Sequence, residues 1–152
     1  MRVRRLGPGE SGLVETAADL FDETPDRAAA SAYLSDRRNV VYLAWDGRGP
    51  VGFLRGSALR QLHTRRLQMF LYEIAVAPRA RRRGVARALI EQLLEYCERR
   101  EFDEVFVFTS PSNRAAVALY RSTGAVTETD EDRMYVYQLA KNRRVHPPPA
   151  KN

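Results

Sequence analysis

The sequence predicts an α/β fold in which helices pack on the faces of a mixed sheet. Three observations support this prediction. The length of 152 residues fits one domain. The turn sequence "DGRGP" separates two β-rich runs, which is typical of a hairpin. In the second half of the chain, β-rich runs alternate with amphipathic helical patterns. Counted in order, these patterns give a sheet of about six to seven strands flanked by about four helices.

The first half of the chain contributes four of the expected strands. They lie at residues 2–6, 39–45, 51–59 and 69–76. Between the first two, apolar residues recur at helical spacing from Glu10 to Asp36. Pro25 divides this segment into two helices, because proline is accepted in the first turn of a helix.

The second half begins with a helix that starts after Gly84 and ends near Arg100. Its apolar residues form the stripe of an amphipathic helix. A strand at 104–109, a helix at 110–124 that ends at Gly124, and a final hairpin at 125–139 follow. The unit from Met69 to Thr109 is strand, helix, strand, so we expect a crossover between two parallel strands.

The net charge of +6 is concentrated at the end of the chain. Four of the positive charges follow Leu139, in a segment that has no acid and three consecutive prolines. We therefore expect residues 1–139 to form one domain and residues 140–152 to form a basic, Pro-rich, disordered tail. The nearly balanced body argues against a nucleic-acid partner.

Several other classes are also excluded by composition. There is no apolar run of about 18 residues and no secretory signal, so we expect no membrane partner. Cys97 is the only cysteine and lies on an apolar helical stripe. An internal disulfide is therefore impossible, which fits a cytoplasmic location. His63 and His146 are isolated, so we expect no metal.

The stretch "RARRRGVARALI" combines a basic loop with a helix start. The first amides of a helix lack intrahelical acceptors and bind anions. Gly84 lets a ligand approach the backbone, and the arginines add positive charge. The stretch is neither a P-loop nor a dinucleotide fingerprint. From these residues alone, a phosphate site and a solvated helix start remain equal alternatives.

Two motifs on the expected elements make the chain resemble the GCN5-related N-acetyltransferase (GNAT) family. The segment from Arg81 to Ala86 matches the family's loop Arg/Gln-x-x-Gly-x-Gly/Ala. Asn113, Ala116, Tyr120 and Gly124 match its second signature, Asn-x-x-Ala-x-x-x-Tyr-x-x-x-Gly. The resemblance implies the family's fold, a twisted, mixed and mostly antiparallel sheet, and its activity, N-acetyl transfer from acetyl-CoA without a metal.

The resemblance also implies which residues contact the coenzyme. The pyrophosphate would bind the loop amides, the pantetheine arm would pair with the preceding strand, and the Val76 amide would stabilise the oxyanion. The expected coenzyme-binding residues are Ile74, Ala75, Val76, Arg81, Arg82, Arg83, Gly84, Val85, Ala86, Asn113 and Ala116. Asn113 is also a candidate helix N-cap.

Glu73 and Tyr120 are the expected catalytic residues. Glu73 lies in an apolar strand, where a carboxylate is costly unless it is paired or used. It would take a proton from the acceptor amine, and the alternative is a buried salt bridge. By the resemblance, Tyr120 would protonate the thiolate that leaves, and the alternative is core packing.

The acceptor is expected to be cationic, because acids gather where the family places its acceptor cleft. Seven acids lie between Glu10 and Asp36, and four more lie in the turn of the final hairpin. Most of them are expected to be solvated. The expected acceptor-binding residues are Asp22, Glu23, Glu73, Glu128 and Asp130.

Within the family, the chain most resembles the short aminoglycoside 3-N-acetyltransferases. Tyr72 to Val76 matches their "Tyr-Asp-Leu-Ala-Val" strand, with Glu73 in place of Asp, and Ala116 to Tyr120 matches their "AVALY" helix. The resemblance implies an aminoglycoside acceptor and a homodimer. Because of the Glu73 difference and a shortened helical region near the N-terminus, a polyamine or a protein or peptide amine remains the alternative. A coenzyme-binding module without turnover is a third possibility, and the presence of Glu73 and Tyr120 argues against it.

Overall fold

The computed structural model describes residues 1–127, 135 and 137 of the chain. They belong to two compact units, Met1–Phe108 and Thr109–Asn152, and each is described by itself. The first unit contains β1 (Arg2–Arg5), α1 (Ser11–Thr16), the 3-10 helix η1 (Ala18–Leu20), α2 (Arg27–Ser35), β2 (Asn39–Asp46), β3 (Gly49–Arg60), β4 (Leu67–Val76), the 3-10 helix η2 (Pro78–Ala80), α3 (Val85–Arg99) and β5 (Glu104–Phe106). The second contains α4 (Arg114–Ser122). None of the helices in these described parts is long and apolar enough to cross a membrane.

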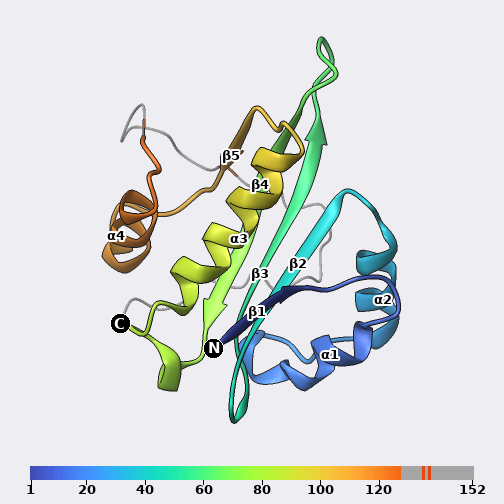
Figure 1. The fold of residues 1–152 in the computed structure, drawn as a ribbon, viewed down its shortest axis with the longest axis vertical. Coiled ribbons are helices and arrows are strands. Elements are labelled where there is room, and N and C mark those ends of the chain that lie inside the picture. Colours follow the sequence, from blue (N-terminus) through green and yellow to red (C-terminus); the bar gives the residue numbers. More distant parts are fainter. Residues whose placement is uncertain (128–134, 136, 138–152) are drawn as a thin grey trace. The chain divides into compact units, whose positions relative to one another are not determined.

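The sheet of the first unit has the strand order β1-β2-β3-β4-β5 (Figure 1). Neighbours are antiparallel from β1 to β4, and β5 is parallel to β4. The chain passes from β4 to β5 through α3, so the mixed sheet and the parallel pair that the sequence predicts are confirmed. The final hairpin expected at 125–139 lies mostly outside the described residues.

Helices cover both faces of this sheet. Neighbouring residues of a strand point to opposite sides, so the strands place apolar side chains on each face. On one face, Phe53 of β3 is fully buried in a core with Leu34 of α2 and Ala17 beside α1. On the other face, a Cβ atom on Gly52 would lie 2.9 Å from Cγ1 of Val85 and 3.3 Å from Cδ1 of Leu89. Gly52 therefore lets α3 pack directly on β3.

A β-bulge interrupts the pairing of β3 with β4. Arg55 faces Glu73, whereas the next residue of β3, Gly56, faces Leu71. Tyr72 is therefore the extra residue of β4, and it is 57% exposed. Bulges of this kind redirect side chains and are frequent beside active sites.

The apolar stripe expected on α3 is its buried side. Leu89, Leu93 and Cys97 are each at most 4% exposed, so Cys97 is a core residue as predicted. Burial raises the pKa of the Cys97 thiol to about 11.

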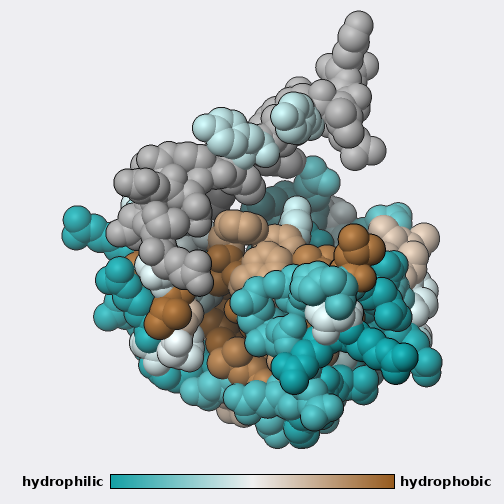
Figure 2. All heavy atoms as spheres, turned by 90° about the horizontal axis from the view of Figure 1, so that it is seen from above, coloured by the Kyte–Doolittle hydropathy of each residue, from teal (hydrophilic) through white to brown (hydrophobic). Residues whose placement is uncertain are grey.

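Figure 2 shows hydrophilic residues over most of the face that it presents, with hydrophobic residues gathered near its middle.

Candidate active site

The loop before α3 contains two residues with positive φ. Gly84 is the N-cap residue of α3 and has φ 79°, in the left-handed region. It provides no side-chain cap, and a Cβ atom added to it would meet no protein atom within 4 Å. Arg82 also has a positive φ, 61°, which is uncommon for a residue other than glycine and is a feature of functional loops.

The end of β4 presents backbone groups on the side away from β3. In the described part of the chain, β5 pairs with β4 only from Gln68 to Phe70. Ala77 donates its amide to the carbonyl oxygen of Val51 in β3, at 2.9 Å. Because amides alternate in direction along a strand, the Val76 amide points away from β3. The Val76 carbonyl accepts a hydrogen bond from Nε of Arg81 at 3.3 Å, which links this strand end to the loop.

Glu73 is paired with an arginine that the sequence analysis did not single out. Nε of Arg55 donates to Oε2 of Glu73 at 2.7 Å, and each side chain is 33% exposed. The salt bridge considered as the alternative role of Glu73 is therefore present, although it is only partly buried. A polar residue in the apolar run "VGFLRGSAL" is the sequence signal for Arg55. Which residue of β4 would face Arg55 could not be predicted, because the bulge shifts the pairing of the two strands by one residue.

Asn113 and Tyr120 lie in the second unit, Asn113 as the N-cap of α4 and Tyr120 within the helix. Oδ1 of Asn113 accepts the Ala116 amide at 3.1 Å, which confirms the predicted N-cap. Burial raises the pKa of the Tyr120 phenol. The helix closes at Gly124, which has φ 95°, and the Ala125 amide donates to the Tyr120 carbonyl at 2.9 Å. This is the Schellman motif expected of a glycine-terminated helix.

Most of the early acids have structural partners. Glu10 accepts the Gly7 amide at 2.7 Å and pairs with Arg4 at 2.8 Å, and these contacts lower its pKa. Asp26 is the N-cap of α2. Two further pairs are Glu15 with Arg27, and Asp36 with Arg38. These four acids therefore have structural roles. Two other early acids lie in the segment between η1 and α2.

Asp22 and Glu23 lie in that segment and are exposed. Glu128 and Asp130 lie outside the described residues. Within residues 1–108, the structure brings together Glu73, the strand Ile74–Val76 and the loop from Arg81 to Ala86 on consecutive elements. Among the described side chains, no group of His, Cys, Asp and Glu could hold a metal ion.

Relatives in sequence are N-acetyltransferases. The chain is 30% identical over 93 residues to N-acetyltransferase 8B of Rattus norvegicus, which covers 61% of this chain and 42% of that protein. It therefore spans less than half the length of that relative. Over 54 residues, 36% of each chain, it is 43% identical to the [ribosomal protein bS18]-alanine N-acetyltransferase of Escherichia coli K12.

Solved structures of acetyltransferases share the fold. An aminoglycoside acetyltransferase from an uncultured soil metagenomic sample, in complex with trehalose, aligns with a TM-score of 0.79 and 23% identity, covering 91% of this chain and 96% of that one. A second one from such a sample aligns with a TM-score of 0.72 and 28% identity, covering 90% and 98%.

The acetyltransferase (GNAT) family matches residues 12–125, which include both motifs. The chain belongs to this family.

Proposed function

We propose that the protein transfers the acetyl group of acetyl-CoA to a primary amine of an aminoglycoside, at the 3-N position, by direct attack in a ternary complex. The observation that carries this proposal is the position of Glu73. It lies at a bulge of β4, next to a strand end with outward amides and one short loop before an anion-binding helix start. The aminoglycoside acetyltransferase that is 28% identical supports the choice of acceptor.

The described residues fit acetyl-CoA. The cap of α3 has open space at Gly84, where a pyrophosphate can approach the amides from Arg82 to Ala86. The Val76 amide points toward the edge where a pantetheine arm can pair as a strand does. When bound, acetyl-CoA supplies the activated acetyl thioester. A neighbour with the same fold, an aminoglycoside N-acetyltransferase at 20% identity and a TM-score of 0.71, is described in complex with CoA.

Each proposed residue has one task in the reaction. Among the described contacts, only Oε2 of Glu73 is hydrogen-bonded, so Oε1 is left to take the proton of the acceptor ammonium. The Val76 amide stabilises the oxyanion. Asn113 hydrogen-bonds the pantetheine through its side-chain amide, and Tyr120 gives its proton to the thiolate that leaves.

The acceptor is recognised by carboxylates. Asp22, Glu23 and Glu73, together with Glu128 and Asp130, bind the ammonium groups of the aminoglycoside. We propose that the protein acts in the cytoplasm as a homodimer and confers aminoglycoside resistance. The 43% identity to the alanine N-acetyltransferase of ribosomal protein bS18 favours one second candidate, acetylation of a protein α-amine.

A thiol-release assay with acetyl-CoA tests the proposal. The panel contains sisomicin and other aminoglycosides, spermidine, and a peptide with an N-terminal alanine. Saturable thiol release with an aminoglycoside, and a product acetylated at N3 by NMR, is the expected result. Turnover of the peptide alone would favour the second candidate. Coenzyme binding without turnover of any amine would mean a module that only binds acetyl-CoA.

A further inference from the structure

Arg55 is the charged neighbour of Glu73, and its geometry suits a role beyond stability. We propose that Arg55 is a positioning residue: it holds the carboxylate of Glu73 in the orientation that takes the proton of the acceptor amine. This inference rests on the proposed catalytic role of Glu73. The two residues face each other across β3 and β4 at the bulge, so their backbone positions are fixed by the sheet.

The contact between the two side chains leaves one carboxylate oxygen available. The bond runs from Nε of Arg55 to Oε2 of Glu73, at 2.7 Å. It is a single bond and not the bidentate fork that arginine commonly forms with carboxylates. Oε1 is therefore oriented without being occupied by any described residue.

The guanidinium of Arg55 is itself held on two aromatic rings. It lies 4.1 Å from the ring centroid of Tyr72, the bulged residue, and 5.8 Å from that of Tyr33 in α2. Cation–π contacts of this kind restrict a side chain that would otherwise have several rotamers. Burial alone would lower the pKa of Arg55, but Glu73 outweighs this effect and raises it, so Arg55 stays charged.

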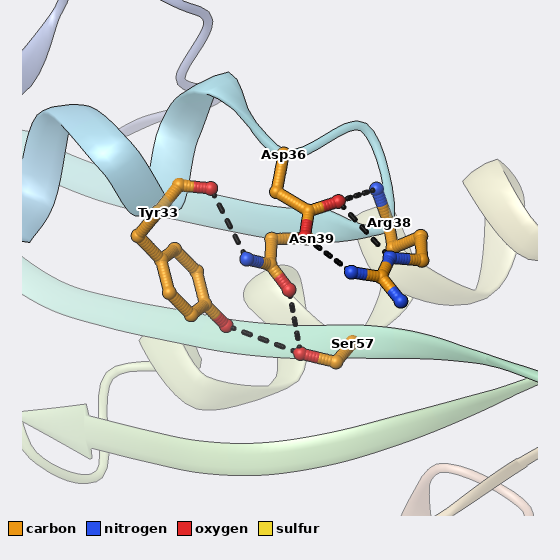
Figure 3. Close-up of polar contacts among 5 residues, drawn as sticks. All are labelled: Tyr33, Asp36, Arg38, Asn39 and Ser57. Carbon is orange, nitrogen blue, oxygen red and sulfur yellow. Dashed lines mark hydrogen bonds and ion pairs between the residues drawn. The ribbon is translucent and has the colours of Figure 1, made fainter.

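Tyr33 is held by hydrogen bonds that join α2 to β2 and β3 (Figure 3). Its hydroxyl donates to the Gly56 carbonyl at 3.2 Å and lies 3.5 Å from Oγ of Ser57. Ser57 donates to Oδ1 of Asn39 at 2.8 Å, and Asn39 donates back to the Tyr33 carbonyl at 3.1 Å. The orientation of Glu73 is thus supported from α2, β2 and β3.

A purely structural salt bridge explains this arrangement less well. A pair in which each side chain is one-third exposed contributes little to stability. Arg66 and Asp103 form a more exposed pair beside the start of β4, at 3.0 Å, in which the Arg66 side chain is 70% exposed. Arg66→Gln therefore serves as a control for the loss of a surface ion pair.

A double-mutant cycle tests whether Arg55 acts through Glu73. Arg55→Gln should lower kcat on the order of 10- to 100-fold for the best amine of the panel, as expected when a reacting group loses its orientation. In a Glu73→Gln background, the same change should have almost no further effect. Arg66→Gln should keep wild-type kcat. Melting temperature and calorimetric binding of acetyl-CoA should stay close to wild type in all variants.

Two further measurements test the contact itself. Arg55→Lys keeps a positive charge beside Glu73 but loses the planar guanidinium, so it should lose less kcat than Arg55→Gln. In the NMR spectrum of the free protein, the Nε–H signal of Arg55 should shift in Glu73→Gln, without any substrate present.

Two results would overturn the inference in different ways. Additive losses in the double variant would show that Arg55 does not work through Glu73, and the proposed function would stand. Full kcat in Glu73→Gln would remove Glu73 from the mechanism, and the inference with it.

Discussion

Gly84 and Arg79 flank the three arginines of the loop, but they are expected to affect the anion site differently. A valine at position 84 would be strained at φ 79° and would project into the open space where a ligand approaches. Arg79 is already bound to Asp46 at 2.6 Å and to the Pro50 carbonyl. Gly84→Val should weaken acetyl-CoA binding about 10-fold or more, and Arg79→Gln less than about 3-fold, by calorimetry. The reverse order would mean that side-chain charge makes the site.

Tyr120 is expected to carry its proton over the whole physiological pH range. Burial raises the pKa of its phenol above the ordinary value of 10.0, so deprotonation should not limit the rate below that pH. If Tyr120 is the acid, Tyr120→Phe should lower kcat on the order of 10²-fold at every pH from 6 to 9. Unchanged kcat across this range would assign Tyr120 to packing alone.

At the level of elements, the start of α4 combines a cap with a proposed ligand. Asn113→Asp keeps an oxygen that can accept the Ala116 amide, but it loses the amide group offered to pantetheine. Asn113→Ala loses both. We expect both variants to bind acetyl-CoA less tightly, and only the alanine variant to lose about 1 kcal/mol of stability in urea. Wild-type affinity in Asn113→Asp would leave capping as the sole function.

The elements themselves were largely predictable. The hairpin of β2 and β3, the stripe of α3 and the glycine end of α4 follow from local patterns. The bulge at Tyr72 and the partner of Glu73 could not be predicted, because a one-residue shift in strand pairing has no local sequence signal. The first helical segment was predicted too long: α1 ends at Thr16 and is followed by the separate 3-10 helix η1.

At the level of the whole molecule, Cys97 can report on unfolding. The residue is 4% exposed, and with a pKa of about 11 only about one thiol in a thousand is ionised at pH 8. Alkylation should therefore require opening of the core, and saturating acetyl-CoA should slow it by stabilising the folded state. The rate of iodoacetamide labelling by mass spectrometry measures this. Rapid labelling that acetyl-CoA does not change would contradict a closed core around α3.

The glycine beneath α3 sets the distance between that helix and the sheet. In Gly52→Ala, the new Cβ would press on Val85, the first residue of α3, and on the Ala75 carbonyl, 3.1 Å away. Gly56→Ala is the matched control, since its Cβ would press on Met69 and the Phe70 carbonyl instead. Both should destabilise the protein, but only Gly52→Ala should also weaken acetyl-CoA binding, measured by calorimetry. Equal affinities in the two variants would contradict this prediction.

Affinity for the coenzyme would then depend on the thickness of a helix–sheet layer as well as on the residues of the loop. A methyl group added at Gly52, beneath the helix, would change the distance between α3 and β3. Engineering of coenzyme preference in this protein can therefore start from the inner side of α3, with every arginine of the loop left in place.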